Sequence, residues 1–128
     1  MPSRTAAVQV VAHRPAGPLM VLGDAVLIEW VLEALVKNAV DALAGRGGTI
    51  DVSAERAADG SVRLRVADDG PGIPRELRRR IFDAGFSTKA RGWGIGLSLA
   101  RRIVQESHGG RLALVPSDRG ATFDVILP

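Results

Sequence analysis

Hydrophobic and polar residues follow two different periods along this chain. Over residues 25–43 apolar side chains recur every three or four positions, which places them on one side of a helix. Over residues 5–12, 49–56, 61–67, 111–115 and 121–127 apolar side chains alternate with polar ones, as in strands with one buried face. The apolar face of the predicted helix comprises Leu27, Ile28, Val31, Leu35, Ala39 and Leu43.

Shorter segments complete the expected elements. Residues 19–22 are predicted to form a short strand that pairs with residues 5–12 as a hairpin. Residues 75–82 are predicted to form a short helix with apolar contacts at Leu77 and Ile81, and the segment 84–93 has little periodicity. A last helix is predicted from Gly94 or Ile95 to Ser107, with inward side chains at Ile95, Leu99, Ile103 and Val104.

Turn residues between these segments define how the strands are connected. Asp24 is placed to cap the long helix, and Asp59-Gly60 is a strong hairpin signal between two strands. Strands joined by such short turns are antiparallel. We therefore expect an α+β fold in one domain, residues 1–128, built as a two-layer α/β sandwich. Its sheet is mixed but mostly antiparallel, and about three helices cover one face.

Composition narrows the class of protein. The chain has 128 residues, 46% hydrophobic and 24% charged, which is ordinary for a globular domain. It contains no cysteine and no long apolar run, so neither disulfides nor a membrane span is expected from this segment. The net charge is +3, but aromatic residues make up only 4%, and basic runs are not interleaved with them. We expect a cytoplasmic location, no membrane contact and no nucleic acid partner.

The segment Asp68-x-Gly70-x-Gly72 is the first candidate for binding chemistry. It places a carboxylate just past the end of a strand, followed by two glycines that allow close approach to the backbone. Such a carboxylate can accept a hydrogen bond from the exocyclic amine of adenine. The alternative is a tight turn in which Asp68 bonds to a nearby backbone group.

A second glycine-rich segment, Gly92-x-Gly94-x-Gly96, opens the last predicted helix. Glycines let backbone N–H groups approach phosphates, and a helix N-terminus favours anions. The spacing matches neither the dinucleotide fingerprint nor the phosphate-binding loop. Lys89 and Arg91, just before this segment, would supply positive charge for terminal phosphates.

Asn38 is the third candidate because asparagine is mildly unfavourable inside a helix. Its amide oxygen could be one of the few protein ligands of Mg²⁺. The alternative is an Asn with no function beside a solvated row of charges, which includes Glu33, Lys37 and Asp41. The two histidines, His13 and His108, are more simply interpreted as surface or capping side chains.

Taken together, four segments resemble the catalytic ATP-binding domain of bacterial sensor histidine kinases. That family shares its fold, often called the Bergerat fold, with type II topoisomerases, MutL-type mismatch-repair ATPases and large heat-shock chaperones. Residues 30–43 resemble its asparagine box, residues 68–73 its first glycine box, residues 81–89 its phenylalanine box, and residues 92–97 its second glycine box. The C-terminal segment 120–128 resembles its last strand.

The resemblance implies a role for each matched residue. Asp68 would accept from the adenine amine, with Gly70 and Gly72 letting the base approach and Thr122 supporting the Asp68 end. Asn38 would ligate Mg²⁺ and Lys89 would contact the phosphates of ATP, so both would take part in catalysis. The phosphate-side turn and lid hinge would comprise Gly92, Gly94 and Gly96, with Phe82 and Phe86 anchoring the lid. The resemblance also places Asp41, Ile73, Ile95 and Leu97 among the nucleotide-binding residues.

The implied function is to present Mg-ATP for γ-phosphoryl transfer to a histidine on separate dimerisation helices, with a response regulator acting downstream. Those helices are absent from residues 1–128. One departure concerns Ala34, where many kinases carry a second Asn and the ATPase relatives a Glu; Glu33 is adjacent but about 100° round the helix. The alternatives are a stand-alone ATPase or nucleotide-gated dimerisation module, and a nucleotide-sensing domain that does not transfer phosphate.

Overall fold

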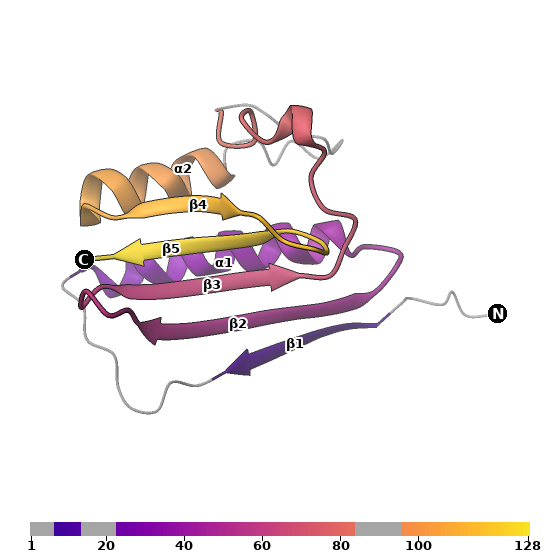
Figure 1. Cartoon of the computed structure of the whole chain (residues 1–128), viewed down its shortest axis with the longest axis horizontal. Helices are drawn as coiled ribbons and strands as arrows, with labels where there is room; N and C mark the ends of the chain where they lie inside the picture. Colours follow the sequence, from indigo (N-terminus) through magenta and orange to yellow (C-terminus); the bar gives the residue numbers. More distant parts are fainter. Residues whose placement is uncertain (1–6, 14–22, 84–95) are drawn as a thin grey trace.

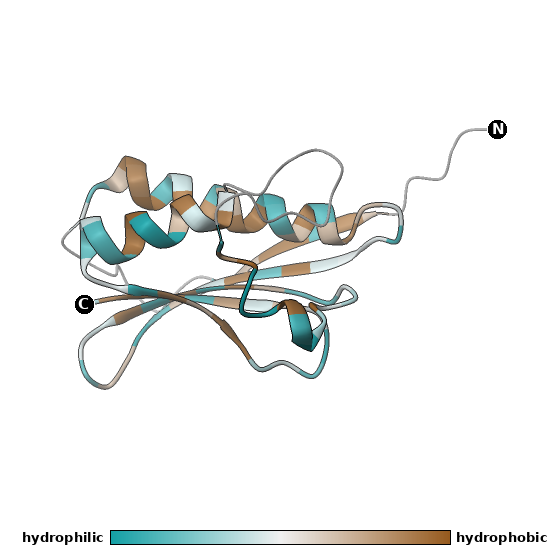
Figure 2. Ribbon diagram, turned by 90° about the horizontal axis from the view of Figure 1, so that it is seen from above, coloured by the Kyte–Doolittle hydropathy of each residue, from teal (hydrophilic) through white to brown (hydrophobic). Residues whose placement is uncertain are grey.

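The computed structural model describes residues 7–13, 23–83 and 96–128. A five-stranded sheet runs in the order β1-β2-β3-β5-β4 (Figure 1). The two α-helices lie together on one face of this sheet (Figure 2). The elements in chain order are β1 Val8–His13, α1 Ala25–Ala42, β2 Gly48–Arg56, β3 Val62–Asp68, η1 Arg75–Leu77, α2 Gly96–Arg102, η3 Ile103–Ser107, β4 Arg111–Val115 and β5 Thr122–Leu127.

Strand pairing agrees with the predicted mixed, mostly antiparallel sheet. The pairs β2–β3, β3–β5 and β4–β5 are antiparallel, and the β2–β3 and β4–β5 hairpins are present. β1 instead pairs with β2 in parallel, with Val8 opposite Gly48 and His13 opposite Ser53. That pairing was not predicted. The expected partner of β1, residues 19–22, lies outside the described residues.

Helix α1 is the central element of the helical layer. Asp24 caps it as predicted, since its Oδ1 accepts from the N–H groups of Val26 at 2.9 Å and Leu27 at 3.2 Å. One face of the helix packs on the sheet and is almost completely buried. Because this face fills the centre of the core, it sets the position of the remaining polar faces. Its buried side chains are Val31, Leu35, Ala39 and, just past the helix, Leu43.

The predicted helix over residues 75–82 is not present. Only Arg75–Leu77 form a helical turn, of the 3₁₀ type, and turns follow to Asp83. The backbone bonds here, such as those from Arg80 to Leu77 and from Asp83 to Arg80, span three residues rather than four. Because only Ile81 is fully buried in this segment, no continuous apolar stripe supports an α-helix. The described residues therefore contain two α-helices rather than about three.

The last predicted helix is present, but one of its inward side chains was assigned wrongly. Leu99 is 40% exposed, whereas Ala100 and Val104, four residues apart, are buried. Ala100 thus takes the buried position predicted for Leu99, whereas Ile103 and Val104 pack on the core as predicted. After Arg102 the helix continues as the π-helical stretch η3. Across the described residues, neither helix is both long and apolar enough to cross a membrane.

The other face of the sheet carries paired charges. Arg65 on β3 holds Asp124 on β5 through two hydrogen bonds of 2.7 and 2.8 Å, and this raises the pKa of Arg65. Arg63 pairs with Glu55, and His13 pairs with Asp51. These pairs lie across neighbouring strands, so they support the register of the sheet. The face is the polar one that strand alternation predicted.

Truncation of Leu35 tests this assignment of the core. Because Leu35 is fully buried between α1 and the sheet, we expect Leu35→Ala to lower the free energy of unfolding by about 2–5 kcal/mol. Leu99→Ala, on the exposed side of α2, is the matched control and should change it by less than about 0.5 kcal/mol. Urea denaturation followed by circular dichroism measures both. Equal losses in the two variants would contradict the orientation described for α2.

Candidate functional site

Asp68 lies at the end of β3 with only 6% of its surface exposed. Its Oδ1 accepts hydrogen bonds from the backbone N–H groups of Gly70 at 2.8 Å and Ala121 at 3.3 Å. Its own N–H donates to the Ala121 carbonyl at 2.9 Å. No described residue bonds to Oδ2, and this atom is not among the buried unpaired ones. The turn-type contact considered as an alternative is therefore present, and it leaves the second oxygen for a donor.

The turns around Asp68 require glycine. A Cβ on Gly70 would lie 2.9 Å from Asp68 Oδ1, too close for an ordinary contact. Gly72 has φ of +79°, and a Cβ there would lie 3.1 Å from the Gly120 carbonyl oxygen. The first glycine segment and the turn before β5 thus pack directly against each other. Both glycines shape the surroundings of the Asp68 carboxylate.

In the sheet register the residue that lies beside Asp68 is Ala121, not Thr122. Thr122 is paired with Ala67, one residue earlier on β3. Side chains one residue apart on a strand point to opposite faces. Thr122 consequently lies on the face with the ion pairs, although it is buried. The expectation that Thr122 supports the Asp68 end does not agree with this register, and the backbone of Ala121 supplies that support.

Asp69 is a second positioning carboxylate that the sequence did not indicate. Its Oδ1 accepts from the Thr49 N–H at 2.9 Å, and its own N–H donates to the Thr49 carbonyl at 3.3 Å. These bonds hold the first glycine segment against the start of β2. No sequence signal separates this residue from Asp68, because both carboxylates precede the same glycines.

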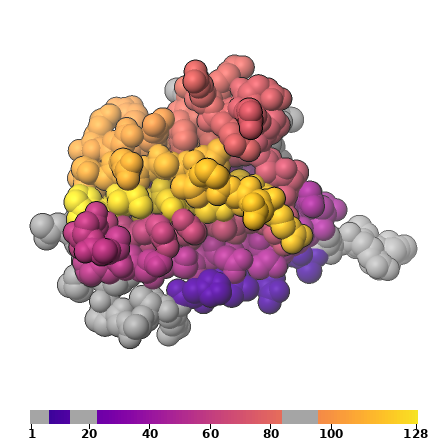
Figure 3. Space-filling model, viewed as in Figure 1, coloured from indigo at the N-terminus to yellow at the C-terminus, as the bar shows by residue number. Residues whose placement is uncertain are grey.

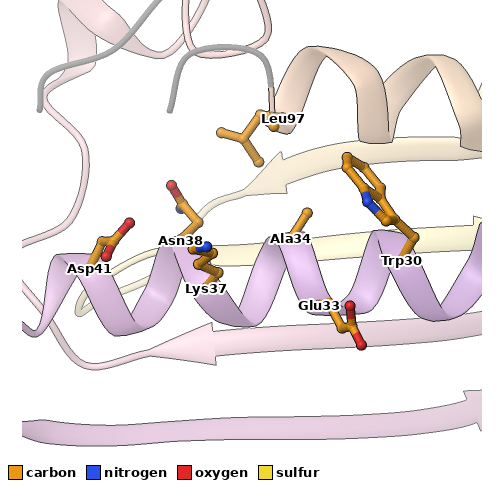
Figure 4. A pocket seen from close by; sticks show the side chains of 8 residues that line it. Trp30, Glu33, Ala34, Lys37, Asn38, Asp41 and Leu97 are labelled. Carbon is orange, nitrogen blue, oxygen red and sulfur yellow. The ribbon is translucent and has the colours of Figure 1, made fainter. Parts of the chain in front are cut away.

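A cavity of about 230 Å³ lies along α1 beside the start of α2. Asn38 and Asp41 line it, as do Gly96 and Leu97, so four predicted site residues are brought together. Figure 4 shows Asn38 projecting towards Leu97, with Trp30 on the same side of the helix. The remaining lining residues, none of them predicted as site residues, are Trp30, Glu33, Ala34 and Lys37.

The spacing of those missed residues could have revealed them. Trp30, Ala34, Asn38 and Asp41 follow one another at steps of four, four and three, which is one side of a helix. Glu33, Lys37 and Asp41 were interpreted as part of a solvated row. The structure instead places all three at the wall of the cavity.

The cavity along α1 and the Asp68 carboxylate lie at neighbouring positions. A Cβ on Gly70 would lie 3.7 Å from the Cβ of Ala42, in the last turn of α1. Asp41 precedes Ala42, and Asn38 lies one turn earlier. An elongated ligand could therefore contact Asp68 at one end and Asn38 at the other.

The donor set in the cavity suits a cation that takes few protein ligands. Within the described ranges, no three carboxylate or imidazole groups converge on one point. The cavity offers the Asn38 amide and the Asp41 carboxylate. Magnesium retains several waters and binds substrate phosphates, so one or two hard oxygen ligands are sufficient.

Several predicted site residues cannot be placed. Lys89, Gly92, Gly94, Ile95 and the lid residue Phe86 lie outside the described residues. Ile73 is partly buried and packs against the core.

The phenylalanine predicted to anchor the lid has ordinary core contacts. The ring of Phe82 meets Phe123 edge-on, with ring centroids 6.1 Å apart. Core packing of this kind is compatible with an anchoring role for Phe82, and that role stays a prediction.

His108 has the capping role that was expected of it. Its Nε2 accepts from the Asp24 N–H at 2.9 Å, so Nδ1 carries the proton and donates to the Ile103 carbonyl at 3.1 Å. The imidazole thereby ties the N-terminus of α1 to the end of the other helix. Both helices that border the cavity are fixed by this contact.

Comparison with known proteins agrees with this architecture. Residues 23–128 match the model of the histidine kinase-, DNA gyrase B- and HSP90-like ATPase family. The signal transduction histidine-protein kinase AtoS of Escherichia coli K12 is 40% identical over 106 residues, covering 82% of this chain and 17% of AtoS. A nucleotide-free catalytic domain of histidine kinase ThkA superposes with a TM-score of 0.83 at 34% identity, covering 94% of this chain and 78% of that one.

ThkA has also been solved in complex with the response regulator protein TrrA. This chain matches ThkA in that complex with a TM-score of 0.78 at 33% identity, over 93% of this chain and 33% of ThkA. The chain spans about a fifth of the length of the curated relatives that it matches first. The predicted two-layer fold and the predicted resemblance are both confirmed. The chain belongs to the family of histidine kinase-, DNA gyrase B- and HSP90-like ATPases, as a catalytic ATP-binding domain of the sensor histidine kinase type.

Proposed function

We propose that this domain presents Mg-ATP for transfer of its γ-phosphoryl group to a histidine on separate helices. The observation that carries the proposal is the Asp68 carboxylate, which is buried and oriented by two backbone N–H groups. One of its oxygens remains for the exocyclic amine of adenine. A hydrogen bond to a charged acceptor in a buried position is strong and geometrically selective.

In this arrangement the nucleotide lies along α1. The base is at Asp68, with Gly70, Gly72 and Ile73 around it, and the phosphates extend towards Asn38. The start of α2, at Gly96 and Leu97, borders the phosphate end of the cavity. Lys89 and the glycines Gly92 and Gly94, with Ile95, belong to the segment between Phe82 and α2 and would contact the phosphates from there.

Asn38 would hold Mg²⁺ together with the phosphate oxygens, and Asp41 would contact the metal through water or the nucleotide directly. When bound, the metal neutralises charge on the transferred phosphoryl group. Ala34, one helical turn before Asn38, lines the same cavity but offers no ligand. The protein thus contributes positioning and charge, while the nucleophilic histidine comes from another domain.

A hydrolysing ATPase is the second candidate, and one observation favours it. Glu33 is one of the residues that line the cavity, but Figure 4 shows its carboxylate directed away from Asn38 and Leu97, so a change of side-chain rotamer would be needed to bring the carboxylate into the cavity. A carboxylate placed within reach of the γ-phosphate could activate water.

The partners follow from the transfer reaction. They are ATP and ADP, histidine-bearing dimerisation helices and, indirectly, a response regulator such as the one solved with ThkA. A cytoplasmic location fits this reaction.

Asp68→Asn tests the assignment of the base. The Asn side chain keeps an oxygen for the backbone N–H groups, but its NH₂ group then faces the adenine amine. Because both groups are donors, no hydrogen bond forms between them. We expect a loss of about 1.5–3 kcal/mol in the binding free energy of ADP. Titration calorimetry measures it, with Asp51→Asn on the opposite sheet face as control. Inosine diphosphate lacks the exocyclic amine, so it should bind weakly to the wild type. Its affinity should then change little in Asp68→Asn. A near-normal ADP affinity in Asp68→Asn would refute the assignment.

Asn38→Ala tests the metal position. We expect the affinity for ATP in Mg²⁺ to fall more than the affinity for ADP in EDTA, because only the former uses the amide ligand. The difference should be about tenfold or more, since even indirect partners of a bound metal contribute about 10–100-fold. Fluorescent nucleotide titrations with and without Mg²⁺ provide the comparison. Equal losses under both conditions would remove Asn38 from the metal site.

A transfer assay tests the reaction itself. The domain is mixed with γ-³²P-ATP and candidate histidine-bearing helices, and we expect acid-labile, base-stable label on the helices. Replacing the acceptor histidine by Gln should abolish that label. Release of free phosphate without helices, abolished by Glu33→Gln, would instead support the hydrolysing ATPase. ATP binding with neither product would support a nucleotide-sensing domain.

A further inference from the structure

A second hollow lies at the opposite border of α2 from the nucleotide cavity. Its volume is about 410 Å³, within the range of pockets that bind ligands. It shares no residue with the cavity along α1. The turns after η1, α2 and β4 lie together at this border of the molecule (Figures 1 and 3). The lining residues are Arg78, Arg79, Phe82 and Arg101, together with 112–116.

One wall of this groove is the free edge of the sheet. β4 is the last strand in the sheet order, and within the described residues it bonds only to β5. Five consecutive residues, 112–116, line the groove. Alternate side chains of a strand point to opposite faces, so a hollow that touches consecutive residues must run along the strand edge. Backbone N–H and C=O groups of β4 therefore face into it, as at any edge strand.

The other wall carries three guanidinium groups that form no ion pair with a carboxylate in the described part of the chain. The Nε of Arg78 donates to the Ile73 carbonyl at 3.2 Å. Arg101 lies over the ring of Phe82, 4.7 Å from its centroid. Arg79 is exposed. A run of arginines is often only a solvated face. Here, however, two members of the run meet Arg101 from a distant helix around one hollow.

We propose that this groove binds an extended acidic peptide segment of a partner protein, which adds as a strand to the edge of β4. The backbone of the segment would pair with β4, as in other cases of strand addition. Its carboxylates would be bound by Arg78, Arg79 and Arg101, because a guanidinium binds a carboxylate through two parallel hydrogen bonds.

The combination of an edge strand and arginines favours a peptide over a free anion. A small anion would satisfy the guanidinium groups but would leave the backbone groups of β4 unused. The groove also has apolar walls at Leu114 and Val115, which are partly exposed and suit side chains on the two faces of an added strand. The docking position is separate from Asp68 and Asn38, so it does not depend on the proposed reaction.

The test uses a fluorescein-labelled peptide, Glu-Val-Glu-Val-Glu, and the same peptide with Lys in place of Glu. Fluorescence anisotropy at low salt should show binding of the acidic peptide alone. Arg79→Glu combined with Arg101→Glu should weaken it at least about tenfold, because like charges are then juxtaposed. Arg46→Glu, in the exposed loop after α1, is the control and should change affinity less than about twofold. Unchanged ADP binding in each variant shows that the domain is folded.

Two further peptides test strand addition. One is N-methylated at the valines and the other at the glutamates, and one of the two should lose at least about tenfold in affinity because its N–H groups face β4. Changes in backbone amide NMR shifts should concentrate in residues 111–115. No binding of the acidic peptide would overturn the proposal, as would an equal loss in Arg46→Glu. Equal binding of both methylated peptides would show anion binding alone and would likewise overturn it.

Discussion

The backbone hydrogen bonds to Asp68 Oδ1 are the contact on which the site depends. They join the end of β3 to the first glycine segment, which follows it directly, and to Ala121, which lies 53 residues further along the chain and just before β5. Gly70 and Gly72 are needed because these parts approach so closely that no side chain fits between them. A buried carboxylate with one oxygen held by backbone donors has a fixed orientation. The remaining oxygen can then distinguish a donor from an acceptor without any mobile side chain taking part.

Helix α1 contributes side chains both to the core and to the site, and neighbouring residues of the helix face one or the other. Ala39 is buried against the sheet, whereas Asn38, one residue and about 100° away, faces the cavity. The apolar contacts of Leu35 and Ala39 therefore fix the rotation at which Asn38 is presented. They also outweigh the mild cost of an asparagine within a helix. His108 adds a second constraint, because it holds the first turn of α1 against the end of the other helix.

Periodicity predicted what is local in this fold and missed what depends on distant parts of the chain. The long helix and the β2–β3 and β4–β5 hairpins were predicted because their patterns and turns lie within short segments. The two strands of the parallel β1–β2 pair are separated in the sequence by the whole of α1, so no local signal specifies their pairing. A shift of one residue accounts for two errors: Leu99 instead of Ala100 as the buried position, and Thr122 instead of Ala121 beside Asp68. One residue changes the side of a helix by about 100° and the face of a strand completely.

The second helix connects the two hollows of the molecule. Leu97, in its first turn, borders the cavity along α1, and Arg101, one turn later, lines the arginine-rich groove. Arg101 also contacts Phe82, whose ring meets Phe123 on β5. A carboxylate that binds Arg101 must therefore share the guanidinium with the face of Phe82. Phe82 and Gly96 stand close to the two ends of the segment that carries Lys89. The groove and the cavity along α1 are thus joined through α2, while Asp68 and its backbone donors lie outside the groove.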